Sequence, residues 1–234
     1  MKAPIILAVD TSDFDTALAW IENTKESVSV YKLGLEFYLN FGSTGVSRII
    51  SETGVDIFLD LKLHDIPHTV SGAASAISNL APKFLTVHAS GGRAMVKAAA
   101  DAVPNVAVTA VTILTSLSEE DLFEIGYSGP ALESAVALAK MAVDSGAKAL
   151  VCSPLETAAI RSAVGTEPVI ITPVVRPLSE VGSDDQKRTM TPKDAIAQGA
   201  NYVVIGRPIT SAWVNGAQAL RDKAALIASE IIGN

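Results

Sequence analysis

The sequence predicts a closed (β/α)8 barrel. Eight short runs of apolar and β-branched residues alternate with eight segments of helical pattern along the whole chain. Over 234 residues this gives about 29 residues per strand–helix unit, and right-handed crossovers of such units favour closure into a barrel. An open, doubly wound sheet is the alternative. It needs a glycine-rich turn after the first strand, whereas residues 10–13 are Asp-Thr-Ser-Asp.

The predicted strands are nearly continuous in apolar residues, as expected for parallel strands that are covered on both faces. They span residues 5–10, 28–35, 56–62, 84–89, 106–114, 148–153, 168–175 and 201–206.

The predicted helices lie between these strands and follow the last of them. They span residues 13–24, 43–53, 68–80, 92–101, 131–145, 154–163, 192–198 and 216–232. Ser12, Thr191 and Asn215 are expected at or near the N-terminal caps, because their side chains can accept hydrogen bonds from free backbone N–H groups. Pro154 and Pro192 suit a first helical turn, where no N–H donor is needed.

Composition excludes several classes of protein. A hydrophobic fraction of 49% with 18% charged residues excludes disorder, and a net charge of −7 argues against a broad nucleic-acid surface. No apolar run reaches the length of a membrane helix, and the N-terminus shows no signal peptide. One cysteine, Cys152, suits a reducing compartment. We therefore expect a cytoplasmic protein whose residues 1–234 form one catalytic barrel domain.

Charged residues on the third predicted strand are the strongest indication of function. Asp60 and Lys62 are two residues apart and face the same side, which must be the barrel interior because the leucines between and around them occupy the other side. Buried ions are costly unless they are paired. Lys32 and Asp65 extend the set to a Lys–Asp–Lys–Asp array, which indicates fixed charges held against a reacting group. A purely structural ion pair is the alternative.

A second signal is anion binding at the last two strands. Arg176 follows the seventh strand, and Gly206 with Arg207 follows the eighth, where barrels often bind a phosphate. The polar segment 176–191 is long enough to be a functional lid. Two ordinary surface arginines are the alternative.

Three weaker signals favour structural roles. His64 and His68 have the spacing of a metal pair on a helix, but Pro67 lies between them and no third ligand is evident, so we expect no metal site. His88 is expected to be a hydrogen-bonded structural residue, and Cys152 a small core residue without a base to activate it.

Residues 60–69, Asp-Leu-Lys-Leu-His-Asp-Ile-Pro-His-Thr, closely resemble the signature of the orotidine 5′-phosphate decarboxylase family. The resemblance extends over essentially the full chain. It continues in Ala8-Val9-Asp10, Tyr31-Lys32-Leu33-Gly34, Leu114-Thr115-Ser116, Pro173-Val174-Val175-Arg176-Pro177 and Val204-Ile205-Gly206-Arg207-Pro208-Ile209-Thr210.

The resemblance implies a homodimer that converts orotidine 5′-monophosphate to uridine 5′-monophosphate and CO₂ in pyrimidine biosynthesis, with no metal or cofactor. Composition has already argued against nucleic-acid and membrane partners. By position, Lys62 is the proton donor, and Asp60 with Lys32 completes the charge array. Asp65, Ile66 and Thr69 are implied to reach the partner subunit's site.

The resemblance also implies the contacts to the nucleotide. Asp10 and Lys32 hold the ribose hydroxyls, and Thr115 contacts the pyrimidine. The implied phosphate ligands are Gln186, Gly206 and Arg207, with Arg176 at the hinge of the closing loop and near the phosphate.

Two positions depart from the family pattern, which usually has Asn at His68 and Gly at Val174. His68 flanks the expected substrate contacts, so its departure is expected to have little effect. Because of Val174, the family pattern does not determine the backbone path after the seventh strand. Two other functions are alternatives: a Mg²⁺-dependent sugar-phosphate decarboxylase or lyase on the same barrel, and a non-catalytic sensor of phosphate ligands.

Overall fold

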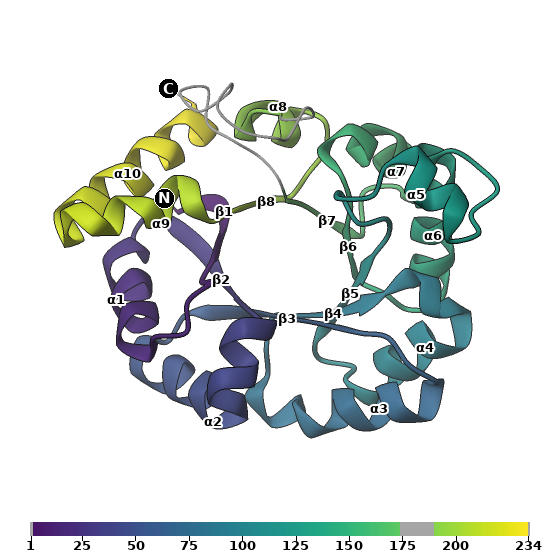
Figure 1. Ribbon diagram of the computed structural model, residues 1–234, viewed down its shortest axis with the longest axis horizontal. Helices are drawn as coiled ribbons and strands as arrows, with labels where there is room; N and C mark the ends of the chain where they lie inside the picture. The colour runs from purple at the N-terminus through teal and green to yellow at the C-terminus, as the bar shows by residue number, and fades with distance from the viewer. Residues whose placement is uncertain (1, 174–189, 234) are drawn as a thin grey trace.

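A computed structural model of the chain describes residues 2–173 and 190–233. Its strands form a closed parallel barrel in chain order, in which β1 pairs with both β2 and β8 (Figure 1). The (β/α)8 prediction is therefore confirmed. The strands are β1 (Ala3–Ala8), β2 (Val28–Gly34), β3 (Asp56–Leu63), β4 (Phe84–His88), β5 (Ala107–Val111), β6 (Ala149–Val151), β7 (Val169–Thr172) and β8 (Tyr202–Ile205).

Helices surround the barrel and cover its outer face (Figure 1). They are α1 (Phe14–Thr24), α2 (Leu35–Thr53), α3 (Pro67–Ala76), α4 (Gly92–Ala102), α5 (Glu119–Glu124), α6 (Ala131–Asp144), α7 (Thr157–Val164), α8 (Pro192–Ala197), α9 (Arg207–Thr210) and α10 (Ala217–Ile232). Short 3₁₀ turns are η1 (Ser78–Leu80), η2 (Ala89–Gly91), η3 (Pro154–Glu156) and η5 (Ser211–Asn215). Within the described residues, no helix has both the length and the apolar character required to cross a bilayer.

Some predicted boundaries were wrong. The helix expected over 43–53 begins at Leu35, and Gly42 interrupts it with a non-helical backbone. α5 and α9 were not expected, because six and four residues are too short for a helical period to show. Ser12 and Asn215, expected at or near caps, each lie one residue before the observed cap, which is Asp13 for α1 and Gly216 for α10. Thr191 caps α8 as predicted, by accepting a hydrogen bond from Asp194 N.

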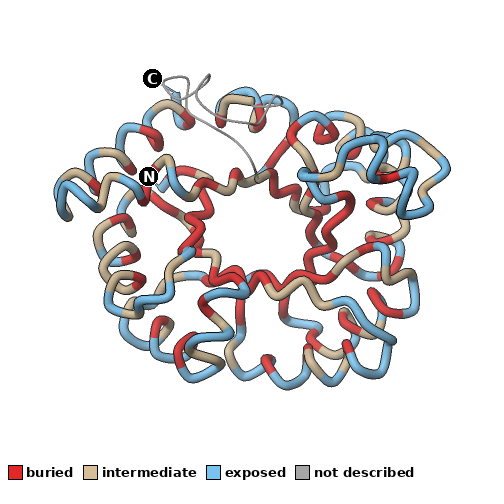
Figure 2. Tube along the Cα trace, viewed as in Figure 1, coloured by how far each residue is buried: buried red, intermediate tan, exposed pale blue. Residues whose placement is uncertain are grey.

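The core has two layers. The larger one lies between the barrel and the helices, and Figure 2 shows its buried residues along the strands and on the inner sides of the helices. The smaller one fills the barrel interior and contains Ile6, Val30, Phe58, Phe84, Ala149 and Ile171. Phe84 makes edge contacts with Phe58 and Tyr202 at ring-centroid distances of 5.6 and 5.8 Å. This packing closes the lumen below the strand ends, so a ligand can enter only at the mouth above it.

Candidate active site

A cavity of about 210 Å³ lies above this packed layer, at the C-terminal ends of the strands. The charged side chains come from one side of the barrel, β2 and β3, whereas strands β5 to β8 and the segments that follow them contribute mostly apolar residues. The cavity is lined by Lys32, Phe58, Asp60, Lys62, Val111, Ile113, Leu114, Thr115, Val151, Cys152, Pro173 and Val204. The apolar wall was not identified from the sequence, because inward-facing valines and isoleucines resemble ordinary barrel filling.

Asp60 is the centre of the charged cluster. Lys62 Nζ lies 2.8 Å from both carboxylate oxygens of Asp60, and Lys32 Nζ lies 3.6 Å from Oδ2. Lys32 Nζ also donates to Asp10 Oδ1 at 3.1 Å. The structure thus brings together four predicted residues from three consecutive strands or the loops that follow them. The prediction that Asp60 and Lys62 face the lumen is confirmed, since Leu59, Leu61 and Leu63 pack against the outer core.

The electrostatics of the cluster keep Asp60 ionised. The Asp60 side chain is 12% exposed and that of Lys32 is 13% exposed, so both are largely removed from water. Burial alone raises the pKa of Asp60. The charges of Lys32 and Lys62, together with hydrogen bonds from Lys62 and Thr86, outweigh burial and hold the pKa below its ordinary value. At neutral pH the cavity therefore contains a fixed carboxylate between two ammonium groups.

The backbone of β3 changes conformation at the site. Lys62 has a φ of +49°, in the left-handed region that is unfavourable for residues with a Cβ atom. Its N–H donates to Thr86 Oγ1 at 2.7 Å, and Thr86 Oγ1 donates to Asp60 Oδ1 at 3.0 Å. Thr86 could not be identified from the sequence as part of the site, because threonine is a common strand residue.

Gly34, at the end of β2, makes room for the second lysine. A Cβ atom at this position would lie 3.1 Å from Lys32 Nζ and 3.6 Å from Asp10 Oδ1. The absence of a side chain therefore allows the Lys32–Asp10 contact to cross this strand end. Asp10 itself is more exposed than Lys32, as suits a group that meets a ligand at the mouth.

The other residues predicted at the mouth lie on separate loops. Thr115 lines the cavity but stands four residues beyond the end of β5. Gly206 precedes α9, and its carbonyl accepts hydrogen bonds from the N–H groups of Ile209 and Thr210. Arg207 is exposed at the first position of that helix. Arg176 and Gln186, with Val174, lie outside the described residues.

Asp65, Ile66 and Thr69 are all exposed and are not among the described residues that line the cavity. The Asp65 carboxylate accepts a hydrogen bond from Ile66 N, at the start of α3. No ion pair joins Asp65 to Lys62 within residues 2–173 and 190–233. A single chain therefore brings Lys32, Asp60 and Lys62 together, and Asp65, the fourth member of the predicted array, lies apart from them.

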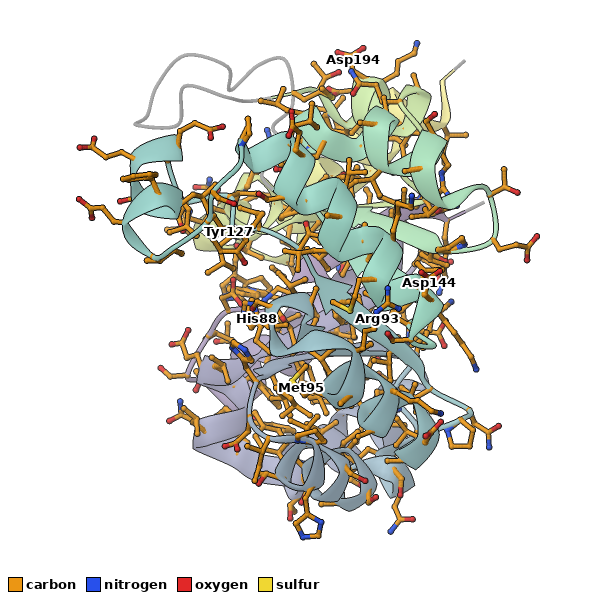
Figure 3. The ribbon with its side chains drawn as sticks, turned by 90° about the vertical axis from the view of Figure 1, so that its right-hand side faces the viewer. His88, Arg93, Met95, Tyr127, Asp144 and Asp194 are labelled. Atoms are coloured by element: carbon orange, nitrogen blue, oxygen red, sulfur yellow. The ribbon has the colours of Figure 1, made fainter. Side chains whose placement is uncertain are left out.

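His88 and Cys152 border the site. The His88 ring lies 5.4 Å from that of His64, and burial, followed by the charges of His64 and Lys62, lowers the pKa of His88. In the side view of Figure 3, His88 and Tyr127 lie toward the same side of the barrel, and Asp144 toward the other. Burial, and then the charge of Glu156, raise the pKa of the Cys152 thiol to about 12, so it is not a nucleophile at neutral pH.

Within the described parts of the chain, no three His, Cys, Asp or Glu side chains are grouped so that they could hold a metal ion. His64 and His68 are both exposed.

Comparison with known proteins gives consistent matches. The profile of the orotidine 5′-phosphate decarboxylase / HUMPS family matches residues 3–222. The chain is 49% identical to an orotidine 5′-phosphate decarboxylase of Thermobifida fusca, over 94% of both chains. It is 43% identical to one of Paramagnetospirillum magneticum, over 97% of this chain and 99% of the relative. A crystal structure of the Lactobacillus acidophilus orotidine 5′-phosphate decarboxylase superposes with a TM-score of 0.83 and 33% identity, covering 99% of this chain and all of that one.

Proposed function

This chain belongs to the orotidine 5′-phosphate decarboxylase / HUMPS family, and we infer that it converts orotidine 5′-monophosphate to uridine 5′-monophosphate and CO₂ in pyrimidine biosynthesis. The observation that carries this inference is the buried cluster in which Asp60 lies between Lys62 and Lys32. We propose that Lys62 is the catalytic residue, and that the whole of residues 1–234 forms one catalytic domain.

The reaction explains why ammonium groups are needed. When the C6–carboxylate bond breaks, CO₂ leaves and the electron pair remains in an in-plane orbital at C6, which the ring π system cannot delocalise. Stabilisation must therefore come from charges that are already aimed at that atom in a site shielded from water. The most demanding reactions require a barrier reduction of up to about 23 kcal/mol. Lys62 supplies the charge, and its proton then bonds to C6 to complete the product.

Asp60 and Lys32 hold Lys62 in place in this proposal. Asp60 is ionised at neutral pH and binds the ammonium group of Lys62 through both oxygens. Lys32 offsets the second negative charge that the substrate carboxylate brings, and with Asp10 it is positioned to bind the ribose hydroxyls. The lysine amine therefore needs little reorganisation when the reaction begins.

The remaining nucleotide contacts are proposed around the same mouth. Thr115, on the cavity wall, is proposed to contact the pyrimidine, and Gly206 with Arg207 to bind the phosphate. From the family resemblance, Gln186 is proposed as a further phosphate ligand, and Arg176 is proposed to lie near the phosphate at the hinge of the closing loop. Binding energy from this remote phosphate can be used to close the site over the substrate, which raises kcat.

We propose a homodimer with shared sites, because Asp65, Ile66 and Thr69 are exposed and are not among the described residues that line the cavity of their own chain. In a dimer they can complete the partner's array. Mixing Asp65→Ala with Lys62→Ala protein should then restore part of the activity, because one site of each mixed dimer keeps both residues. No recovery after proven subunit exchange would contradict a shared site.

The proposed reaction is tested by incubating the protein with orotidine 5′-monophosphate and EDTA, and by following the loss of ultraviolet absorbance and the release of CO₂. Turnover in EDTA is expected for the wild type, and none for folded Lys62→Ala. Activity that requires added Mg²⁺ would favour the sugar-phosphate lyase, and binding without turnover would favour a sensor.

The cellular compartment of the protein follows from the same proposal. The sequence has one cysteine, which is buried, so the fold does not depend on an oxidising compartment. We propose the cytoplasm, where free nucleotides are made.

A further inference from the structure

One hydroxyl group links the two central residues of the charged cluster. Thr86 lies in the middle of β4 and is fully buried. Its Oγ1 accepts a hydrogen bond from the backbone N–H of Lys62 at 2.7 Å and donates one to Asp60 Oδ1 at 3.0 Å. Thr86 is not among the described residues that line the cavity, so these two contacts, rather than substrate binding, define what its side chain does.

The Thr86 hydroxyl lies where the pairing between β3 and β4 is interrupted. β3 and β4 pair at Leu59 with Leu85 and again at Leu63 with Val87, so four steps along β3 correspond to two along β4. The regular ladder is therefore lost around Lys62, and its N–H bonds to a side chain instead. Without that acceptor, a partly buried backbone donor would be left unpaired, which is unfavourable.

The same interruption contains the left-handed backbone of Lys62. A lysine does not adopt this conformation unless its surroundings hold it there. The Thr86 hydroxyl is one such restraint, because it binds the N–H of the unfavourable residue directly. Rotation about the Lys62 backbone would redirect the whole side chain and with it the ammonium group.

The direction of both hydrogen bonds is determined by chemistry. A backbone N–H can only donate and an ionised carboxylate can only accept, and a hydroxyl has one proton and two lone pairs. Thr86 must therefore accept from Lys62 and donate to Asp60, and no other arrangement satisfies all three groups. The hydroxyl connects the two residues in one orientation.

We propose that Thr86 is a positioning residue for the decarboxylation. Its hydroxyl holds the Lys62 backbone and the Asp60 carboxylate in the arrangement that directs the Lys62 ammonium group toward the reacting carbon. This inference rests on the proposed function. Small misplacement of a catalytic group lowers the rate strongly, so removal of the hydroxyl should reduce kcat while KM changes little.

Thr86→Val keeps the shape of the side chain and removes both hydrogen bonds, whereas Thr86→Ser keeps the hydroxyl. Thr109→Val is the matched control: Thr109 is the register partner of Thr86 on β5 and is equally buried, but its hydroxyl donates to Ala107 O in its own strand. We expect kcat to fall at least about tenfold in Thr86→Val, and to stay within about threefold of wild type in Thr86→Ser and Thr109→Val.

The pH profile separates positioning from general packing. Loss of the Thr86 hydrogen bond removes one of the contacts that lower the pKa of Asp60, so the acidic limb of kcat/KM should move to higher pH in Thr86→Val alone. The proposal is overturned by a normal kcat in Thr86→Val, by an equal loss in Thr86→Ser, or by an equal loss in Thr109→Val. If Thr86→Val does not fold, Thr86→Ala replaces it in the same comparison.

A titration keeps this test independent of the proposed reaction. The carboxyl ¹³C signal of Asp60, assigned by its absence in Asp60→Asn, reports the pKa of that group without substrate. A higher pKa in Thr86→Val than in wild type and Thr86→Ser supports the link even if the wild type does not act on orotidine 5′-monophosphate, which would refute the proposed function alone. An unchanged Asp60 pKa would refute the Thr86 link.

Discussion

Replacement of Asp60 by asparagine tests the charged cluster through stability rather than activity. The amide has nearly the same shape but carries no charge, so Lys32 and Lys62 lose the carboxylate that lies 3.6 and 2.8 Å from their nitrogen atoms. Two ammonium groups then remain in a site that is largely removed from water. We therefore expect Asp60→Asn to fold, but with a clearly lower free energy of unfolding.

The magnitude follows from these distances. With an effective dielectric constant of about 20, the contacts to Lys62 and Lys32 correspond to about 6 and about 5 kcal/mol of Coulomb attraction. Most of this is offset by the desolvation of Asp60, and the contact to Lys62 is weakened by water because that side chain is 34% exposed. Removing one partner of a buried ion pair costs about 3–5 kcal/mol in general, and we expect about 3 kcal/mol here.

Urea unfolding at fixed protein concentration measures this difference. With an m value of about 3 kcal/mol per molar, the midpoint should fall by about 1 M. Asp56→Asn is the control on the same strand: its ion pair with Lys83, at 2.6 Å, is exposed, and we expect a loss below about 1 kcal/mol.

The pH dependence has a defined sign. In the folded protein the pKa of Asp60 lies below its ordinary value of 3.8. Its ionised form therefore stabilises the fold fully at neutral pH, and this stabilisation is lost as the pH falls through 3.8 toward the pKa of the folded state. The difference in the free energy of unfolding between wild type and Asp60→Asn should be the same at pH 7.5 and at pH 5.5, and smaller at pH 4. Equal stability at pH 7.5, or a difference that does not shrink on acidification, would refute the reasoning.

Three further changes test other parts of the site. Arg207→Ala should weaken binding of uridine 5′-monophosphate by at least about tenfold and that of uridine by less than about twofold, as measured by calorimetry; equal losses would contradict a phosphate contact. Gly34→Ala places a Cβ atom 3.1 Å from Lys32 Nζ, so kcat/KM should fall about tenfold while the melting temperature changes by only a few degrees; normal kinetics would show that Lys32 can move freely. Cys152, with a thiol pKa of about 12, should resist iodoacetamide at pH 8 in the native protein and react after unfolding in urea, as followed by mass spectrometry; rapid native labelling would contradict its burial.

The barrel could be predicted because its signals repeat. Each strand is a nearly continuous apolar run, and the charges at Asp60 and Lys62 break that pattern at one end of β3, which indicates the position of the mouth from the sequence alone. The short helix α5 was missed although Ser118 and Asp121 form a capping box, because six residues contain too little of a helical period.

Other features depend on the backbone and could not be predicted. Nothing in the residues around Lys62 indicates a left-handed conformation, which needs the register shift between β3 and β4. Thr86 has a role only because that shift brings its hydroxyl to the Lys62 N–H. The place of Asp65 away from its own cavity is likewise a property of the loop after β3 and not of residue spacing.

The cavity is divided between two halves of the barrel. Its charged side chains come from β2 and β3, whereas Val111, Ile113, Val151 and Val204 belong to its apolar wall. The chemistry and the shape of the chamber are therefore encoded in separate stretches of the chain. Laboratory evolution directed at the second half alone could widen or reshape the chamber for altered bases while leaving the ionic machinery intact.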